Sequence, residues 1–486
     1  MALTSATVTA SDESTRYDAI VVGAGTSGGT MARDLAEEGL RVLVLEAGPH
    51  LSRETYPRNE LDGNSWLYWG GGVELNTDAS IGTLRPRVVG GGGIVNQALM
   101  DRFDDIALDD FRAASGVDFF RRDAMAPYYE QAESRMALEE VPEQYRNRNA
   151  EIFAEGFARN GYRVKPLRRA ESNCHFEEGN SCVECLGGCR IDSKQSPNVT
   201  SIPKALAAGA RLISQMEVGE VAETADGVVV RARGADGVER TFRGARLVLA
   251  SGAIGNSKLL LSSGFDERLP RIGHDYYTHP QYMNLALYDE PVGAFRGPLQ
   301  NYKSDDAGFR RQGFKLENVF AGPVGIAMLV PGIAREHSEV MAQLDHLACV
   351  EVCVRDTTPG RIRIAKGATG VKGAIGTAPV IDKRLGDEDK RRRDHGMDAI
   401  RNIFYSTGAK KIIPGRIGIG LHLMGGLGMG QGADDSVVGA DFRLHGSRRI
   451  WAADSSIFPN APGVNPSLTI QALSIKAAET IVKESR

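Results

Sequence analysis

The first strongly patterned stretch of the chain runs from Tyr17 to Gly48. An apolar run at 19–22 is typical of a strand buried on both faces, and a second run at 41–45 has the same character. Between these runs, positions 30–38 show helical spacing, and Gly39 is the residue type that often follows a helix C-terminus. The pattern therefore predicts a strand, a helix and a second, parallel strand.

The turn after the first strand carries the pattern G-x-G-x-x-G, formed by Gly23, Gly25 and Gly28. Such glycines allow a tight turn, a close approach of backbone to a pyrophosphate, and packing of the helix on the strand. The N-terminus of the following helix faces the phosphates. Glu46 ends the second strand and is suited to bind ribose hydroxyls and to repel a 2′-phosphate. The unit predicts a dinucleotide site, disfavours NADP, and leaves FAD and NAD open.

Two further stretches predict close contact between backbone and a ligand. Four successive glycines occupy 90–93, flanked by Arg87 and Asn96. They present bare backbone to a flat or charged ligand, although a flexible linker is the alternative. A buried strand at 245–250 ends in the small residues Ser251 and Gly252, which also allow a cofactor to approach.

The rest of the chain shows a mixed pattern. We expect helices at 127–136, 149–160 and 386–404, strands within 211–233, 322–330 and 347–354, a turn at 234–237 and a loop-like region after Gly48. The predicted fold class is α/β with an α+β second domain. A Rossmann-type domain is assembled from the discontinuous segments 17–110, 200–265 and 421–486, and an antiparallel-sheet substrate domain is inserted at 266–420. Residues 111–199 form a helical, cysteine-containing connecting region, and 1–16 a disordered leader.

Composition narrows the function classes. The chain has 486 residues, 42% hydrophobic and 25% charged, which is ordinary for a soluble globular protein. A net charge of −4 provides no basic field and argues against nucleic acid as a partner. No stretch reaches the roughly 20 apolar residues of a membrane span, so we expect no such span and a cytoplasmic protein.

Four of the six cysteines, Cys174, Cys182, Cys185 and Cys189, lie close together in the sequence. This spacing raises the possibility of an iron–sulfur or other metal site. No proline follows Cys189 directly and no histidine lies at zinc-finger spacing, so buried thiols or a loop disulfide are favoured and no metal site is predicted. Two more cysteines, at 349 and 353, are expected in the core on a strand.

Four motifs in order connect the chain to a known family. They are G-A-G-T-S-G from Gly23, G-G-G-G-I-V-N from Gly90, H-L-M-G-G-L-G-M-G from His422, and A-D-S-S-I-F-P followed by N-P-S-L-T-I near the end. Over nearly its whole length the sequence resembles the glucose–methanol–choline (GMC) oxidoreductases, which are FAD-dependent alcohol oxidases and dehydrogenases. The resemblance implies FAD. It also implies non-covalent binding, since Val95 stands where some members carry the histidine that is linked to the flavin.

The resemblance, together with the strand ends described above, yields a predicted set of FAD-binding residues. They are Gly23, Gly25, Thr26, Ser27, Gly28, Glu46, Ala47, Arg87, Gly91, Gly92, Asn96, Val218, Ser251, Gly252, Asp454, Ser455, Asn465, Pro466 and Thr469. Thr469 is expected on the helix whose N-terminus points at the isoalloxazine ring.

The same resemblance maps the catalytic pair of the family onto His422 and Asn465. Histidine suits a general base because its ordinary pKa near 6.5 leaves it mostly neutral at pH 7. The amide of Asn465 is suited to donate a hydrogen bond to the developing alkoxide. The other histidines considered, His274, His279 and His445, are predicted to be structural or at the surface.

The predicted function is oxidation of a primary or secondary alcohol, such as a sugar, an aminosugar or another secondary-metabolite alcohol, by an FAD-dependent oxidoreductase. The hydroxyl proton passes to a base and a hydride to flavin N5. The partners expected are a small-molecule alcohol and an electron acceptor, either oxygen or an unidentified carrier. A non-redox lyase of the hydroxynitrile type that retains FAD is the alternative, and an electron-transfer subunit with a metal cluster is a weaker one.

Overall fold

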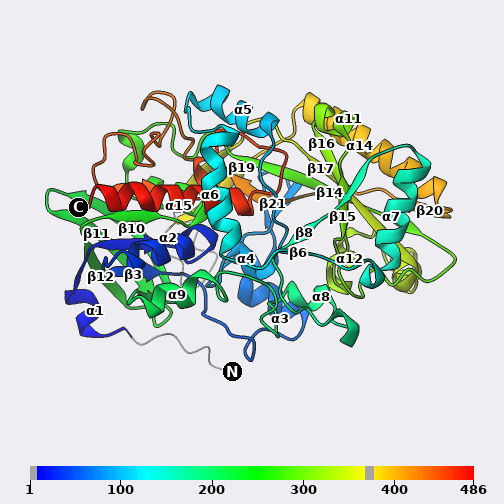
Figure 1. Ribbon diagram of the computed structural model, residues 1–486, viewed down its shortest axis with the longest axis horizontal. Coiled ribbons are helices and arrows are strands. Elements are labelled where there is room, and N and C mark those ends of the chain that lie inside the picture. The colour runs from blue at the N-terminus through cyan, green and yellow to red at the C-terminus, as the bar shows by residue number, and fades with distance from the viewer. Residues whose placement is uncertain (1–7, 367–376, 486) are drawn as a thin grey trace.

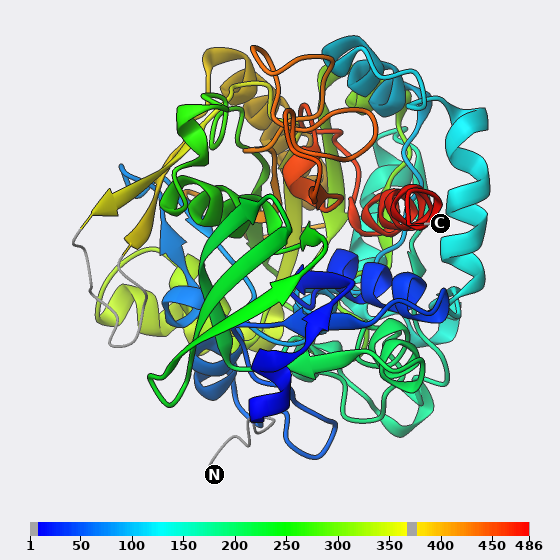
Figure 2. The same ribbon diagram turned by 90° about the vertical axis from the view of Figure 1, so that its left-hand side faces the viewer.

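A five-stranded parallel sheet joins segments that lie far apart in the sequence. Its strand order is β22 (Ile450–Ala452), β13 (Leu247–Leu249), β2 (Ala19–Val22), β3 (Val42–Leu45) and β9 (Arg211–Ile213). All three predicted segments of the Rossmann-type domain contribute to it. The computed structural model describes residues 8–366 and 377–485, and Figures 1 and 2 show their arrangement.

Helices cover this sheet and complete the predicted strand–helix–strand unit. The first helix, α2 (Thr26–Glu37), starts earlier than the apolar spacing predicted, because Gly25 is its N-cap. It packs against α15 (Ser467–Lys483), which lies beside it in Figure 1, and against α9 (Ser201–Ala207). On its other side α15 packs against α6 (Arg122–Ser134). The C-terminal helix is thus held directly against the helix that follows the first glycine turn.

A second, four-stranded sheet extends this domain. Its order is β1 (Arg16–Tyr17), β12 (Glu239–Gly244), β11 (Gly227–Gly234) and β10 (Met216–Thr224), which confirms the β-structure predicted within 211–233. Ahead of it, α1 (Ala10–Ser14) carries the buried residue Asp12, which accepts hydrogen bonds from Arg211. The prediction of a disordered leader at 1–16 is therefore wrong for 10–14, and its first seven residues lie outside the described residues.

A nine-stranded sheet forms the other half of the molecule. The order is β4 (Glu74–Leu75), β5 (Ile81–Thr83), β21 (Gly418–Met424), β14 (Tyr277–Leu287), β17 (Leu347–Val354), β16 (Phe314–Asn318), β15 (Tyr302–Ser304) and β7 (Val164–Pro166), with β20 (Lys411–Ile413) pairing with β14. Its central strands run antiparallel. Strands β4, β5 and β7 come from outside 266–420, so the sheet crosses the boundaries drawn from sequence.

The two faces of this sheet differ in character. Tyr282, Leu316 and Val352 belong to an apolar core, and the sheet packs there against α7 (Arg148–Arg159) and α14 (Asp387–Ser406). Their neighbours along the strands point to the opposite face, because side chains alternate along a strand. Several of those neighbours are polar, and they line the cavity described below.

Two local predictions are wrong. The run at 322–330 forms α12 (Pro323–Leu329), with a proline in the first helical turn, rather than a strand. The region after Gly48 contains α3 (Glu60–Leu67). In addition, α6 begins ahead of the predicted start and includes Pro127 in its interior.

The remaining elements are short, apart from a few surface helices and one hairpin. They are α4 (Gly92–Val95), α5 (Asp105–Ser115), α8 (Cys182–Cys185), α10 (Gly252–Ser262), α11 (Ala307–Gln312), α13 (Arg335–Met341), β6 (Glu139–Glu140), β8 (Arg168–Arg169), β18 (Arg361–Lys366), β19 (Thr377–Asp382), η1 (Trp69–Gly72), η2 (Glu143–Tyr145), η3 (Phe176–Glu178), η4 (Phe265–Glu267), η5 (Leu344–His346) and η6 (Ser455–Ile457). Within 8–366 and 377–485, no helix combines the length and apolar character that a membrane crossing requires.

Candidate active site

A cavity of about 1060 Å³ is lined by both large sheets and their connections. It begins at the carboxyl ends of β2, β3 and β13, where ligands bind in open parallel sheets. Most of the predicted site residues line it: Gly23, Gly25, Thr26, Ser27, Glu46, Ala47, Gly91, Gly92, Asn96, Val218, Ser251, Gly252, His422, Asp454, Ser455, Asn465 and Pro466. The structure thus brings together segments that span more than 400 residues of sequence.

Three predicted residues do not line the cavity. Gly28 packs so closely that a Cβ there would lie 1.9 Å from the carbonyl oxygen of Gly23. Arg87 lies over the ring of Trp69, 4.8 Å from its centroid. The hydroxyl of Thr469 is hydrogen-bonded to Tyr129 at 2.7 Å, which fixes α15 against α6. These residues support the cavity from behind, and Thr469 belongs to the helix whose first residues line it.

The two glycine turns meet at the cavity wall. Gly23 has a φ of +99° and a Cβ there would lie 2.4 Å from the Ala250 oxygen, so only glycine fits without displacement of backbone. A Cβ on Gly91 would lie 2.8 Å from the Cα of Gly25. This contact leaves bare backbone from both turns on the cavity side, which is the arrangement a pyrophosphate needs.

Gly91→Ala is expected to weaken flavin binding and to lower the free energy of unfolding by about 1–3 kcal/mol. Gly91 has φ 51° and ψ −137°, a conformation that residues with a Cβ rarely adopt, and the new methyl would press on Gly25. Urea unfolding and flavin titration of the apoprotein measure the two effects. Gly179→Ala is the control, since Gly179 also has positive φ but open space around it. Equal flavin affinity in both variants would contradict a role of the two glycine turns in flavin binding.

Two acidic residues of the Rossmann-type domain, Glu46 and Asp454, stabilise the turns at the cavity through hydrogen bonds. Glu46 is buried, and its two carboxylate oxygens accept hydrogen bonds from the backbone N–H groups of Ala24 (2.9 Å) and Gly48 (2.8 Å). Burial raises the pKa of Glu46, against the lowering effect of these hydrogen bonds. Asp454 accepts hydrogen bonds from the Gly252 N–H (2.7 Å) and from Asn256 (2.9 Å), which ties the start of α10 to the C-terminal segment.

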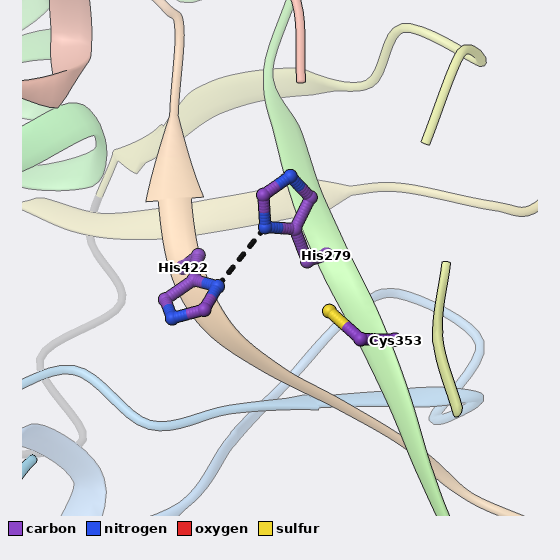
Figure 3. A group of neighbouring side chains, drawn as sticks. All are labelled: His279, Cys353 and His422. Carbon is purple, nitrogen blue, oxygen red and sulfur yellow. Dashed lines mark hydrogen bonds between the residues drawn. The ribbon is translucent and has the colours of Figure 1, made fainter. Parts of the chain in front are cut away.

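His422 lies on β21 and its Nδ1 is 3.0 Å from the Nδ1 of His279 on β14 (Figure 3). The Nε2 of His279 accepts a hydrogen bond from the backbone N–H of Gly463 at 2.8 Å. A neutral His279 therefore carries its proton on Nδ1 and donates it to His422. His422 in turn carries its own proton on Nε2.

Both rings remain neutral at physiological pH. Burial, and then the charge of Lys315, lower the pKa of His422 to about 3. Burial and the neighbouring ring also lower the pKa of His279 well below its ordinary value. The Cys353 thiol completes a group whose ligand-type atoms lie within 4.8 Å of one another (Figure 3). Since both nitrogens of His279 take part in hydrogen bonds, this group is organised for hydrogen bonding.

Asn465 is oriented by a buried lysine that the sequence analysis did not identify. The Nζ of Lys315 donates to the Oδ1 of Asn465 and to the Oε1 of Glu317, the latter at 2.8 Å. Because an ammonium group can only donate, the Asn465 oxygen must face Lys315. Burial opposes the charge on Lys315, but the Glu317 carboxylate outweighs it and raises the pKa of the lysine. The Nδ2 amide of Asn465 is left to donate to a ligand in the cavity.

The cysteine segment supports the second glycine turn. All six cysteines are free thiols. The hydrogen bond between the Cys185 and Cys189 side chains lowers the pKa of Cys189 and raises the pKa of Cys185. A buried lysine that follows the cysteines, Lys194, donates from Nζ to the carbonyl oxygens of Ile94 (2.6 Å), Asn96 (2.9 Å) and Cys185 (2.7 Å). The segment therefore clamps the loop that carries Asn96 at the cavity wall.

Comparisons with known proteins relate this chain to one family. The family model described as GMC oxidoreductase matches residues 17–281 with its N-terminal part and 377–474 with its C-terminal part. An uncharacterised GMC-type oxidoreductase of Mycobacterium tuberculosis is 30% identical over 96% of this chain and 76% of its own length. A long-chain-alcohol oxidase of Arabidopsis thaliana is 25% identical over 96% of this chain and 67% of its own.

A solved structure has the same fold. The crystal structure of pyridoxine 4-oxidase from Mesorbium loti superposes with a TM-score of 0.72 at 17% identity and covers 95% of this chain and 98% of that one.

Proposed function

This chain belongs to the GMC oxidoreductase family and is an FAD-dependent oxidoreductase that acts on CH–OH groups, and we propose that it oxidises a primary or secondary alcohol to the carbonyl compound with FAD bound non-covalently. The observation that carries this proposal is the placement of His422 and Asn465 on the wall of the cavity that the glycine turns also line.

The residues present fit the flavin nucleotide. Gly25 and Gly91 form a cradle that a Cβ would fill, and Glu46 lies at the end of β3 where a ribose is expected. The N-terminus of α15 reaches the cavity through Ser467, and its dipole favours negative charge there. When bound, FAD supplies the ring that accepts a hydride from the alcohol carbon.

His422 and Asn465 act on the alcohol oxygen. In the resting arrangement His422 offers an Nε2–H and Asn465 an Nδ2–H, so both are hydrogen-bond donors. Two donors directed at one oxygen hold the alcohol in place and stabilise negative charge that develops on it. Lys315 and His279 do not contact the alcohol in this scheme; they are positioning residues that fix the orientation of the amide and the tautomer of the imidazole.

The predicted role of His422 as a base requires a rearrangement. Its Nε2 can accept the hydroxyl proton only when the proton between the two rings lies on His422 Nδ1. His279 would then carry its proton on Nε2 and lose the hydrogen bond from Gly463. Oxidation of the alcohol needs an acceptor for the hydroxyl proton, so this rearrangement, with the proton passing to His422 Nε2, is part of the proposed step. The resting hydrogen bonds give the donor arrangement that precedes it.

Anaerobic flavin bleaching tests the proposed function. The purified holoprotein is mixed with a panel of primary and secondary alcohols without oxygen, and the flavin absorbance is followed. Bleaching by an alcohol is the expected result, and recolouring on admission of air identifies oxygen as an acceptor. Unbleached flavin together with cleavage of a cyanohydrin would replace the proposal with a lyase of the hydroxynitrile type.

Acid precipitation tests the mode of flavin binding. Trichloroacetic acid is expected to release the yellow flavin quantitatively into the supernatant, because Val95 cannot form the histidyl link known in the family. Absorbance spectra of the supernatant and the redissolved pellet measure the distribution. Flavin retained in the pellet would contradict non-covalent binding.

A further inference from the structure

The cavity-facing side of the nine-stranded sheet carries an unusual set of polar side chains. Across β14, β17 and β16, Gln281 lies opposite Cys353, and Cys353 opposite Lys315. Two residues further along, Met283 lies opposite Glu351, and Glu351 opposite Glu317. Directly paired residues of antiparallel strands point to the same face. Two adjacent rows thus place acids and an amide side by side, and Gln281, Glu317 and Glu351 all line the cavity.

Glu351 differs from the other buried charges of this face in having no ionic partner. Lys315 is paired with Glu317, and the nearby Lys303 is paired with Asp101. No described residue forms a salt bridge with Glu351, although it is 2% exposed. Its side chain is hydrogen-bonded to Glu317, and it accepts a further, long hydrogen bond from Gln300 at 3.4 Å. Two carboxyl groups in hydrogen-bond contact must share a proton, and Glu351 is the one that carries it, because Glu317 is paired with Lys315. Burial and the adjacent Glu317 accordingly raise the pKa of Glu351 well above its ordinary value.

Gln281 supplies a second, independent observation. Its Nε2 lies 3.9 Å from the sulfur of Cys353, while its Oε1 is buried and receives no hydrogen bond from any described residue. Gln281 is only 3% exposed. A buried acceptor without a donor costs free energy, which a donor group on a ligand in the cavity would recover. The oxygen of Gln281 and the carboxyl of Glu351 are acceptors on adjacent positions of one cavity wall.

We propose that Glu351 and Gln281 form a subsite for a protonated amine carried by the alcohol substrate, so that the enzyme acts on amino alcohols. This inference rests on the proposed function. An ammonium group donates three hydrogen bonds and supplies the positively charged partner that the Glu351 carboxyl group lacks. When the ammonium group binds, Glu351 gives up its proton to solvent water, and the ammonium–carboxylate ion pair forms inside the cavity. Gln281 accepts a further N–H.

The register also limits the spacing between amine and hydroxyl. The Cys353 sulfur lies within 4.8 Å of a nitrogen of His422. Glu351 is two residues away on the same face, or about 7 Å along the strand. The amine is therefore expected several bonds from the reacting carbon rather than on the neighbouring atom. Aminosugars oxidised away from the amine and linear ω-amino alcohols meet this requirement.

The experiment compares matched ligands with and without the amine on the holoprotein. The pairs are glucosamine with glucose, and 6-amino-1-hexanol with 1,6-hexanediol. Dissociation constants come from perturbation of the flavin spectrum, and rates from anaerobic bleaching. For at least one pair the amine is expected to bind at least tenfold more tightly than its neutral partner, since a charge-assisted hydrogen bond is stronger than a neutral one.

Glu351→Gln is expected to abolish this preference while leaving the affinity for the neutral partner within about twofold. Because Glu351 is already protonated in the free protein, the isosteric amide should be tolerated, and the melting temperature checks this. Gln281→Met is the second variant and is expected to reduce the preference in part. Equal binding of amine and neutral partner in both pairs, or a preference that survives Glu351→Gln, overturns the subsite.

The two proposals fail in distinguishable ways. Bleaching by neutral alcohols without any preference for amines removes the subsite and leaves the proposed function standing. Amine-selective binding that depends on Glu351, without bleaching by any alcohol, confirms the subsite and removes the proposed oxidation.

Discussion

His422→Ala is expected to leave the protein yellow and to slow anaerobic reduction of its flavin by an alcohol by about 100-fold or more. The variant removes the Nε2–H that we propose donates to the alcohol oxygen, and loss of one such donor typically costs about 10²–10³ in rate. The glycine turns and Glu46 remain, so flavin content should not change. Stopped-flow absorbance measures the rate, and an unchanged rate removes His422 from the mechanism.

A second substitution at the same position separates the two roles of His422. Glutamine can donate from an amide N–H, but it cannot take up a proton. If donation is the main role, as the hydrogen bonds of His279 and Gly463 favour, His422→Gln should reduce the flavin clearly faster than His422→Ala. Equal loss in both variants would instead favour the base role. His445→Gln is the matched control, since that ring is hydrogen-bonded to Ser436.

Much of the first domain could be predicted because its signals are local. The strand–helix–strand unit at 17–48 combines period, cap and turn residues within one stretch, and the structure contains all its elements. The structure of the run at 322–330 was harder to predict, since a short apolar run fits a buried strand or a helix equally well. Its proline in the first turn, Pro323, was the available signal for a helix.

The partners of the proposed catalytic pair, His422 and Asn465, could not be predicted for a different reason. His279 and His422 are 143 positions apart, and Lys315 and Asn465 are 150 positions apart. His279 and His422 meet because the antiparallel strands β14 and β21 pair across a long connection. Asn465, in contrast, reaches Lys315 of β16 from the segment ahead of α15. A single sequence carries no local sign of either contact. No motif surrounds His279, Lys315 or Glu351. Positions with recognisable motifs could therefore be named from the sequence, and the residues that contact and orient them could not.

Lys315→Met is expected to lower the free energy of unfolding by about 3–5 kcal/mol, because removal of one member of a buried ion pair leaves the other charge unpaired. Glu317 is 1% exposed and would lose its paired cation, and Asn465 would lose the donor that orients its amide. The double variant Lys315→Met/Glu317→Gln removes both charges and should recover most of the loss in urea unfolding. Arg335→Met is the control, because its exposed pair with Glu339 should contribute at most about 0.5 kcal/mol. A loss in Lys315→Met no larger than in this control would show that the buried pair does not stabilise the sheet face on which Lys315 meets Asn465.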